Sequence, residues 1–198
     1  MNQTPMTRPV LTLPAEEAAL VMSAYAAARV ILEYGSGGST ILAAEQPGKV
    51  IFSVESDAKW LADMQSWFAL HPPLGTVHMH HGNIGRTKAW GHPIDASAFR
   101  DWPGYPLSIW DLPDFLHPDL VFIDGRFRAA CFLTCLFRST QPMTVLWDDY
   151  ADRPLYHSVE TLVKPVAMIG RLARFEITPI PLPVERLAWV IETYLRPN

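Results

Sequence analysis

Glu33-Tyr34-Gly35-Ser36-Gly37-Gly38-Ser39-Thr40 is the most informative segment of the sequence. A short β-branched run beginning at Arg29 precedes it, and the helix-compatible residues 41–45 follow, so the expected order is strand, glycine turn and helix. Glycines at such a turn let the main chain approach a ligand closely and direct free N–H groups toward it. A second acid, Glu55, ends the next apolar run, at a distance where its carboxylate can accept hydrogen bonds from both hydroxyls of a ribose. The plainer alternative is a structural glycine turn accompanied by a surface glutamate.

Strand and helix patterns alternate on both sides of this segment. Apolar runs predict strands at residues 50–55, 77–81, 120–124 and 144–148, and amphipathic patterns predict helices at 14–28, 59–70, 128–138 and 157–166. The last two strands are expected at 172–178 and 187–194, joined by a proline-rich segment and paired antiparallel. The order predicts an α/β fold: a doubly wound, mostly parallel, seven-stranded Rossmann-like sheet with a C-terminal antiparallel β-pair. Ligands of such sheets bind at the carboxyl ends of the strands.

Composition bounds the class of protein. The 198 residues are 49% hydrophobic and 18% charged, which suits one domain over residues 1–198 with a single sizeable core. The net charge is −4 and the basic residues are scattered, so nucleic acid is not an expected partner. Cys131 and Cys135 share a predicted helix and are expected to be reduced core residues. No targeting or membrane-spanning pattern occurs, so we expect a soluble, cytoplasmic protein without a membrane partner.

The segment at residues 31–40, followed by Val-Glu-Ser-Asp at 54–57 and by Trp60, resembles the cofactor motifs of class I methyltransferases that use S-adenosylmethionine. The resemblance spans most of the chain, from the first strand to the terminal β-pair. It implies that Glu33 faces the amino end of the methionine moiety and that the turn from Gly35 through Ser36, Gly37 and Gly38 to Ser39 and Thr40 passes beneath the cofactor. Glu55 would hold the ribose, Ser56 and Trp60 would lie near the adenine, and Asn83 would reach the adenine amino group.

Three carboxylates follow two neighbouring predicted strands. Asp124 ends the strand at 120–124, and Asp148 and Asp149 end the strand at 144–148, so all three are expected at the rim that carries the glycine turn. Hard oxygen ligands suit Mg²⁺ or another divalent cation, which would polarise an acceptor hydroxyl. The spacing is similar to that of cation-dependent O-methyltransferases, although Asp149 stands where that family has Asn. The alternatives are that Asp124 acts as a general base or caps the following helix.

Arginines flank these acids. Arg126, Arg128 and Arg153 either pair with the carboxylates or hold an anionic substrate through charge-assisted bonds, and Arg126 or Arg128 is the candidate for orienting the acceptor. The segments around Asp124 and Asp149 look like those of uncharacterised bacterial methyltransferase-like proteins and, more distantly, of plant polysaccharide O-methyltransferases.

A long segment, residues 84–118, interrupts the alternation and is rich in aromatic residues and proline. Such segments in compact domains are usually functional or disordered, and its tryptophans argue for order. It would cover the cofactor and offer aromatic faces to a ring or sugar, or it would pack on the sheet or on a second subunit of a homodimer. His78, His80 and His81 lack further ligands at zinc-site spacing and are interpreted as polar strand residues.

We therefore expect a methyltransferase that moves a methyl group from S-adenosylmethionine to an oxygen or nitrogen nucleophile of a small or sugar-like acceptor. Asp124 is the expected base or metal ligand, assisted by Asp148 and Asp149. Two alternatives stay open at this point. One is a binding or regulatory domain that keeps the cofactor without catalysis, and the other is a nicotinamide-dependent Rossmann oxidoreductase, whose fingerprint usually has a glycine where this chain has Thr40.

Overall fold

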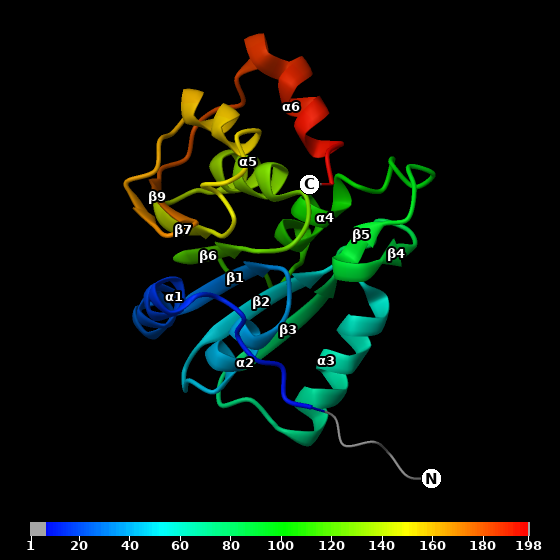
Figure 1. Ribbon diagram of the computed structural model, residues 1–198, viewed down its shortest axis with the longest axis vertical. Helices are drawn as coiled ribbons and strands as arrows, with labels where there is room; N and C mark the ends of the chain where they lie inside the picture. Colours follow the sequence, from blue (N-terminus) through cyan, green and yellow to red (C-terminus); the bar gives the residue numbers. More distant parts are fainter. Residues whose placement is uncertain (1–6, 198) are drawn as a thin grey trace.

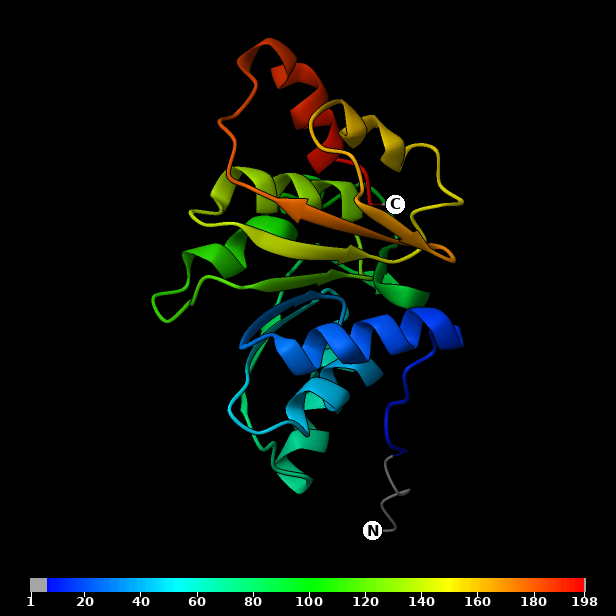
Figure 2. The same ribbon diagram turned by 90° about the vertical axis from the view of Figure 1, so that its left-hand side faces the viewer.

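The structure, a computed structural model, describes residues 7–197 and has three layers (Figures 1 and 2). The middle layer is a seven-stranded sheet in the order β3-β2-β1-β6-β7-β9-β8. The first five strands of that order run parallel, and β9 and β8 are antiparallel to their neighbours. The strands are β1 (Val30–Tyr34), β2 (Val50–Glu55), β3 (Thr76–His81), β6 (Leu120–Ile123), β7 (Met143–Trp147), β8 (Ala167–Ile169) and β9 (Leu172–Ile177). The predicted fold class is confirmed.

Helices cover both faces of the sheet because successive strand residues point to opposite sides. In β6, Leu120 and Phe122 pack with α1 (Ala15–Ala27) and α2 (Gly38–Ala44), whereas Val121 and Ile123 pack with α5 (Arg128–Arg138). Helix α3 (Ala58–Leu70) lies on the α2 side, and α6 (Leu187–Tyr194) packs on α5. Burying each large apolar side chain contributes roughly 1.5–3 kcal/mol, so the two apolar layers hold the strand ends in fixed positions.

The C-terminal part corrects two sequence expectations. Residues 187–194 form helix α6, not a strand, and the antiparallel partner of β9 is β8. The reason is tertiary: apolar residues recur at helical spacing, so Val190 packs into the core on α5, and the hydroxyl of Tyr194 lies 2.7 Å from that of Thr134. Of the helix expected at 157–166, the structure has a short 3₁₀ helix, η3 (Tyr156–Thr161).

The segment at 84–118 is ordered and packs on the carboxyl ends of the strands. It contains the strands β4 (Thr87–Lys88) and β5 (His92–Pro93), joined by η1 (Ala89–Gly91), and then α4 (Gly104–Leu107) and η2 (Ser108–Asp111). Tyr105 is buried between two glycines: a Cβ on Gly82 would lie 2.6 Å from its ring, and one on Gly125 would lie 2.1 Å from its hydroxyl. The segment therefore forms one wall beside the ends of β1, β3 and β6.

Within residues 7–197, no helix is both long enough and apolar enough to cross a membrane. Cys131 and Cys135 are buried, unpaired with each other, and part of the main core, as expected. His78 stacks on Phe52 with ring centroids 4.6 Å apart, and His80 bonds the Ser108 hydroxyl at 2.7 Å. These histidines serve packing and hydrogen bonding in β3, as the sequence suggested.

Candidate functional site

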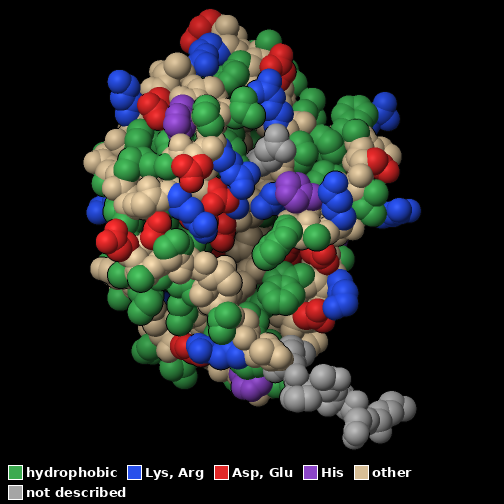
Figure 3. All heavy atoms as spheres, viewed as in Figure 1, with side chains coloured by type: hydrophobic (Ala, Val, Ile, Leu, Met, Phe, Trp, Pro, Cys, Tyr) green, Lys and Arg blue, Asp and Glu red, His purple; other side chains and the backbone are tan. Residues whose placement is uncertain are grey.

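A cavity of about 460 Å³ lies at the carboxyl ends of β1, β2 and β6, within the size range of small-molecule sites. Figure 3 shows the hollow on this face, with hydrophobic and charged side chains around it. The cavity is lined by the turn after β1, the end of β2, the loop after β6, the η1 segment and an N-terminal strap: Pro9, Val10, Leu11, Thr12, Gly35, Ser36, Gly37, Gly38, Ser39, Glu55, Ser56, Asp57, Trp60, Trp90, Gly91, Tyr105, Asp124, Gly125 and Arg126.

The three glycines of the turn after β1 differ in what a side chain at their positions would contact. Gly35 has φ +104° and packs back to back with the loop after β6, since a Cβ there would lie 2.7 Å from the nitrogen of Gly125. At Gly38 a Cβ would lie 2.0 Å from the carbonyl carbon of Val10, in the strap formed by residues 9–12. At Gly37 nothing lies within 4 Å. Gly37 is thus the point in this turn where bare main chain meets open space.

Glu55 lies next to this turn and lines the cavity. Its side chain is 8% exposed, and its Oε2 accepts a hydrogen bond from the amide of Ser36 at 3.2 Å while Oε1 accepts from the amide of Asp57 at 2.8 Å. Burial raises the pKa of Glu55, and these amide hydrogen bonds act in the opposite direction. The turn after β1 and the end of β2 are therefore tied together by one carboxylate that also borders the cavity.

Aromatic side chains stand on either side of Glu55. Trp60 donates from Nε1 to the carbonyl of Ser36 at 2.8 Å, which holds the indole against the turn. Trp90 is 85% exposed and has φ +64°, a left-handed conformation that is costly for a bulky residue. The next residue, Gly91, is fixed against the end of β2. Ser56 donates to the carbonyl of Gly91 at 3.0 Å, and a Cβ on Gly91 would lie 2.4 Å from the Ser56 hydroxyl oxygen. Two indoles thus border the end of the cavity near Ser56.

Three residues predicted to contact the cofactor lie outside the cavity lining: Glu33, Thr40 and Asn83. Glu33 is fully buried behind the turn, where the Tyr25 hydroxyl donates to Oε1 and Oε2 has no partner in the described part of the chain. Burial raises the pKa of Glu33. Thr40 is also buried, and its Oγ1 accepts from the Gly37 amide at 2.9 Å. Both residues shape the turn from below.

Asn83, which was expected to reach the adenine amino group, does not border the cavity. Strand β3 is followed by Gly82, which packs against the ring of Tyr105. The next residue, Asn83, forms a local turn in which its Oδ1 accepts a hydrogen bond from the amide of Gly85 at 3.0 Å. Asn83 is exposed and does not line the cavity. The local turn, not the strand end, determines where its side chain points.

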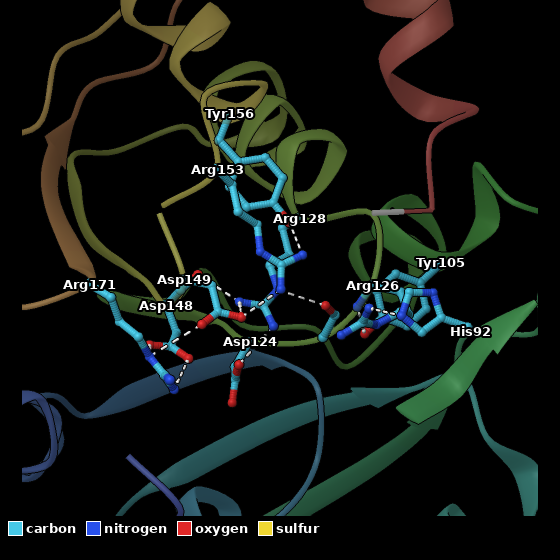
Figure 4. Close-up of polar contacts among 11 residues, drawn as sticks. His92, Tyr105, Asp124, Arg126, Arg128, Asp148, Asp149, Arg153, Tyr156 and Arg171 are labelled. Carbon is cyan, nitrogen blue, oxygen red and sulfur yellow. Dashed lines mark hydrogen bonds and ion pairs between the residues drawn. The ribbon is translucent and has the colours of Figure 1, made fainter. Parts of the chain in front are cut away.

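The carboxylates after β6 and β7 converge, as their strand positions predicted, but each already has a guanidinium partner (Figure 4). Arg128 is 3% exposed and lies 3.0 Å from Asp124 and 3.3 Å from Asp149. The other contacts in the cluster are Arg171 to Asp148 at 2.8 and 2.9 Å, Arg171 to Asp149 at 3.2 Å, and Arg153 to Asp149 at 2.9 Å.

This cluster does not fit the predicted divalent cation. Cation ligands need free carboxylate oxygens that face a common point, whereas the oxygens of Asp148 and Asp149 accept from arginines. In the part of the chain that the structure describes, no group of three or more His, Cys, Asp or Glu side chains is arranged to hold a metal ion. Arginine side chains supply the positive charge at this rim.

Asp124 is the member of the cluster that reaches the cavity. Burial raises its pKa from 3.8 to about 7; the neighbouring charges of Asp148 and Asp149 act in the same direction, and Arg128 opposes them. A carboxyl group that titrates near neutral pH is suited to take a proton from a ligand. The geometry thus assigns Asp148 and Asp149 to the supporting ion-pair network and leaves Asp124 at the cavity.

Sequence reasoning missed three contributors. Arg171 follows Gly170 at the turn between β8 and β9, and nothing near it marks it as a partner of Asp148. His92 bonds Arg126 across the cavity rim, 34 positions away in sequence. The strap at residues 9–12 has no recognisable motif. Each is placed by long-range packing, so no local signal was available.

Comparison with solved structures identifies the family. A methyltransferase-like protein from Silicibacter pomeroyi DSS-3 shares 47% sequence identity with a TM-score of 0.93, and the match covers 96% of this chain and 99% of that chain. This chain belongs to the class I S-adenosylmethionine-dependent methyltransferase family. The predicted resemblance to this family is confirmed.

More distant methyltransferases share the fold. An O-methyltransferase from Bacillus cereus, solved with S-adenosylhomocysteine, has a TM-score of 0.56 at 14% identity and matches 85% of this chain and 83% of that chain. The O-methyltransferase TomG from Streptomyces achromogenes, solved with S-adenosylmethionine, has a TM-score of 0.50 at 22% identity and matches 78% of this chain and 63% of that chain. No model of a protein family and no curated protein matches the chain.

Proposed function

We propose that this methyltransferase transfers a methyl group from S-adenosylmethionine to an oxygen or nitrogen nucleophile of a small acceptor, with Asp124 as the base. One observation carries the proposal: the carboxylate of Asp124 lines the same cavity as the glycine turn and Glu55, and its pKa is raised. A base beside a cofactor pocket is what the transfer needs, because a hydroxyl acceptor must lose its proton as the methyl arrives.

The described residues fit the cofactor. The open space at Gly37 lets the main chain approach it, Glu55 is placed to accept from ribose hydroxyls, and Trp60 with Ser56 borders the adenine end. Glu33 supports the turn from below, where its carboxylate is fully buried and accepts from the Tyr25 hydroxyl. When bound, the cofactor supplies a methyl group that its sulfonium has already activated.

The protein's remaining task is alignment and proton removal. Arg128 forms an ion pair with the carboxylate of Asp124 and also contacts Asp149. Asp149 is paired with Arg153, and the neighbouring Asp148 is paired with Arg171, so the network keeps the guanidinium of Arg128 in place. The proton of the acceptor moves to a carboxylate oxygen of Asp124. Trp90 and the strap at residues 9–12 form parts of the cavity wall and would limit access of water to a bound cofactor.

The acceptor is proposed to be a small molecule with a ring or sugar face. Trp90 precedes Gly91, which contacts Ser56, and His92, which bonds Arg126, so its exposed indole borders the cavity between the cofactor side and the acceptor side and offers a flat apolar surface for such a face. The net charge of −4 argues against a polyanionic nucleic-acid acceptor.

The test has two steps. Titration calorimetry with S-adenosylmethionine and with a nicotinamide cofactor is expected to show binding of the former alone. Labelled methyl transfer into a small-molecule cell extract is then expected to yield product with the unchanged protein. Binding without transfer to any extract fraction would instead establish a non-catalytic cofactor-binding domain.

A further inference from the structure

Arg126 and Arg128 lie two positions apart, but their surroundings differ in charge. Arg128 contacts the carboxylates of Asp124 and Asp149 and donates to the carbonyls of Gly125 and Asp148. Arg126 has no ion pair with any residue in the range 7–197, although its side chain lines the cavity. Figure 4 shows it apart from the acidic cluster, beside His92.

The guanidinium of Arg126 is poorly satisfied by the protein. The residue is 8% exposed, and its Nε is buried without a hydrogen-bond partner in the described part of the chain. Its side-chain hydrogen bond within that range runs from Nη1 to Nε2 of His92 at 2.6 Å. Burying a charge without a counter-ion costs free energy, and an anionic ligand bound beside Arg126 would reduce that cost.

The local field points the same way. The pKa of His92 is lowered, first by burial and then by the positive charges of Arg126, Lys88, Arg153 and Arg128, so its ring stays neutral and accepts from Arg126. Burial and Arg128 likewise lower the pKa of Arg126, although a guanidinium stays charged at neutral pH. The carboxylate of Asp124, which also lines the cavity, is already paired with Arg128.

We infer that Arg126, positioned by His92, binds an anionic oxygen group of the methyl acceptor, so that the acceptor class is small molecules carrying a carboxylate or phosphate in addition to the reacting hydroxyl. This inference rests on the proposed function, because it places the acceptor between Asp124 and Arg126 in the cavity they share. Guanidinium is suited to both anions, since it donates in a plane to two oxygens at once.

The experiment uses the full chain loaded with S-adenosylhomocysteine, whose binding is measured first by calorimetry. Benzoate and inorganic phosphate are then titrated, with benzamide as the uncharged match for benzoate. We expect at least one of the anions to bind and benzamide to bind roughly 10- to 100-fold more weakly than benzoate, the factor expected for a hydrogen bond to a charged group. The Nε–H resonance of Arg126 should shift on addition of the anion.

Two variants assign the effect. Arg126→Gln is expected to lose the preference for the anion while it keeps its melting temperature and its affinity for S-adenosylhomocysteine. Arg174→Gln, which removes an exposed arginine paired with Glu176 on β9, should keep the preference. Three results overturn the inference. They are a preference that survives in Arg126→Gln, failure of both anions to bind at millimolar concentration, and a loss of affinity for S-adenosylhomocysteine in Arg126→Gln, which would assign Arg126 to the carboxylate of the cofactor. Failure of the unchanged protein to bind S-adenosylhomocysteine would instead remove the proposed function on which it rests.

Discussion

The two halves of the cavity are built in different ways. On the β1–β2 side, the wall comes from two short continuous segments, residues 35–39 and 55–60, and the carboxylate of Glu55 ties them together. On the β6–β7 side, three carboxylates are held by arginines from three separate places: Arg128 in α5, Arg153 in the loop after β7, and Arg171 at the β8–β9 turn. In the proposed function, the local segments bind the cofactor, whereas the side assembled from distant residues receives the acceptor.

Replacing the base should have the largest effect. In Asp124→Asn we expect kcat to fall by about 10²- to 10⁴-fold, the usual contribution of a general base, because the amide cannot take the acceptor's proton. Affinity for S-adenosylmethionine should stay within a few-fold, since Glu55 and the turn are untouched. The matched control is Asp114→Asn, an exposed acid outside the cavity lining. Unchanged turnover in Asp124→Asn would remove the assignment.

The two ends of the glycine turn should differ in stability. Gly35→Ala is expected to lower the free energy of unfolding by about 2–5 kcal/mol, because φ is +104° and the new Cβ meets the main chain of Gly125. Gly37→Ala should change stability by less than about 1 kcal/mol, since its Cβ enters open space, and should weaken cofactor binding instead. Denaturant unfolding of both variants measures this, and equal losses would contradict it.

The acceptor side should set the pH dependence. The pKa of Asp124 is raised to about 7, and only its ionised form accepts a proton, so activity is present above that pH and is lost below it. We expect kcat/KM to fall about tenfold per pH unit below 7. Cofactor affinity measured over the same range provides the control. A rate that stays flat down to pH 5 would show that Asp124 is not the base.

Chelation should have the smallest effect. Because arginines occupy the oxygens of Asp148 and Asp149, we expect EDTA to leave the methyl-transfer rate unchanged and added Mg²⁺ to give no increase. Arg171→Ala is the informative partner variant, since it frees both oxygens of Asp148. A rate that falls with EDTA and recovers with Mg²⁺ would restore the cation hypothesis.

The sequence predicted most of the fold because its signals are local. The β-branched run before Gly35 and the apolar runs at β2, β3, β6 and β7 each indicate a strand from a few residues, and alternation with helices implies the parallel order. The error at residues 187–194 has the opposite cause. Leu-Ala-Trp-Val-Ile-Glu-Thr-Tyr is compatible with either a strand or a helix, and contact with α5 decides it.

The candidate site divides in the same way. The positions of Gly35, Gly37 and Glu55 beside one cavity could be expected from spacing alone. The roles of Asp148 and Asp149 could not, because the guanidinium of Arg171 reaches them from a hairpin 22 or more residues later. Likewise, nothing in the loop after β6 distinguishes the paired Arg128 from the unpaired Arg126, since the difference is made by residues brought in by the fold.

The most direct test measures the affinity of S-adenosylhomocysteine for Glu55→Gln and Asp124→Asn side by side by calorimetry. We predict that Glu55→Gln binds at least about tenfold more weakly than the unchanged protein, the effect of losing a charged hydrogen-bond acceptor, while Asp124→Asn stays within a few-fold. Equal affinities for the two variants, or a greater loss in Asp124→Asn, would contradict the division of the cavity into a cofactor half and an acceptor half.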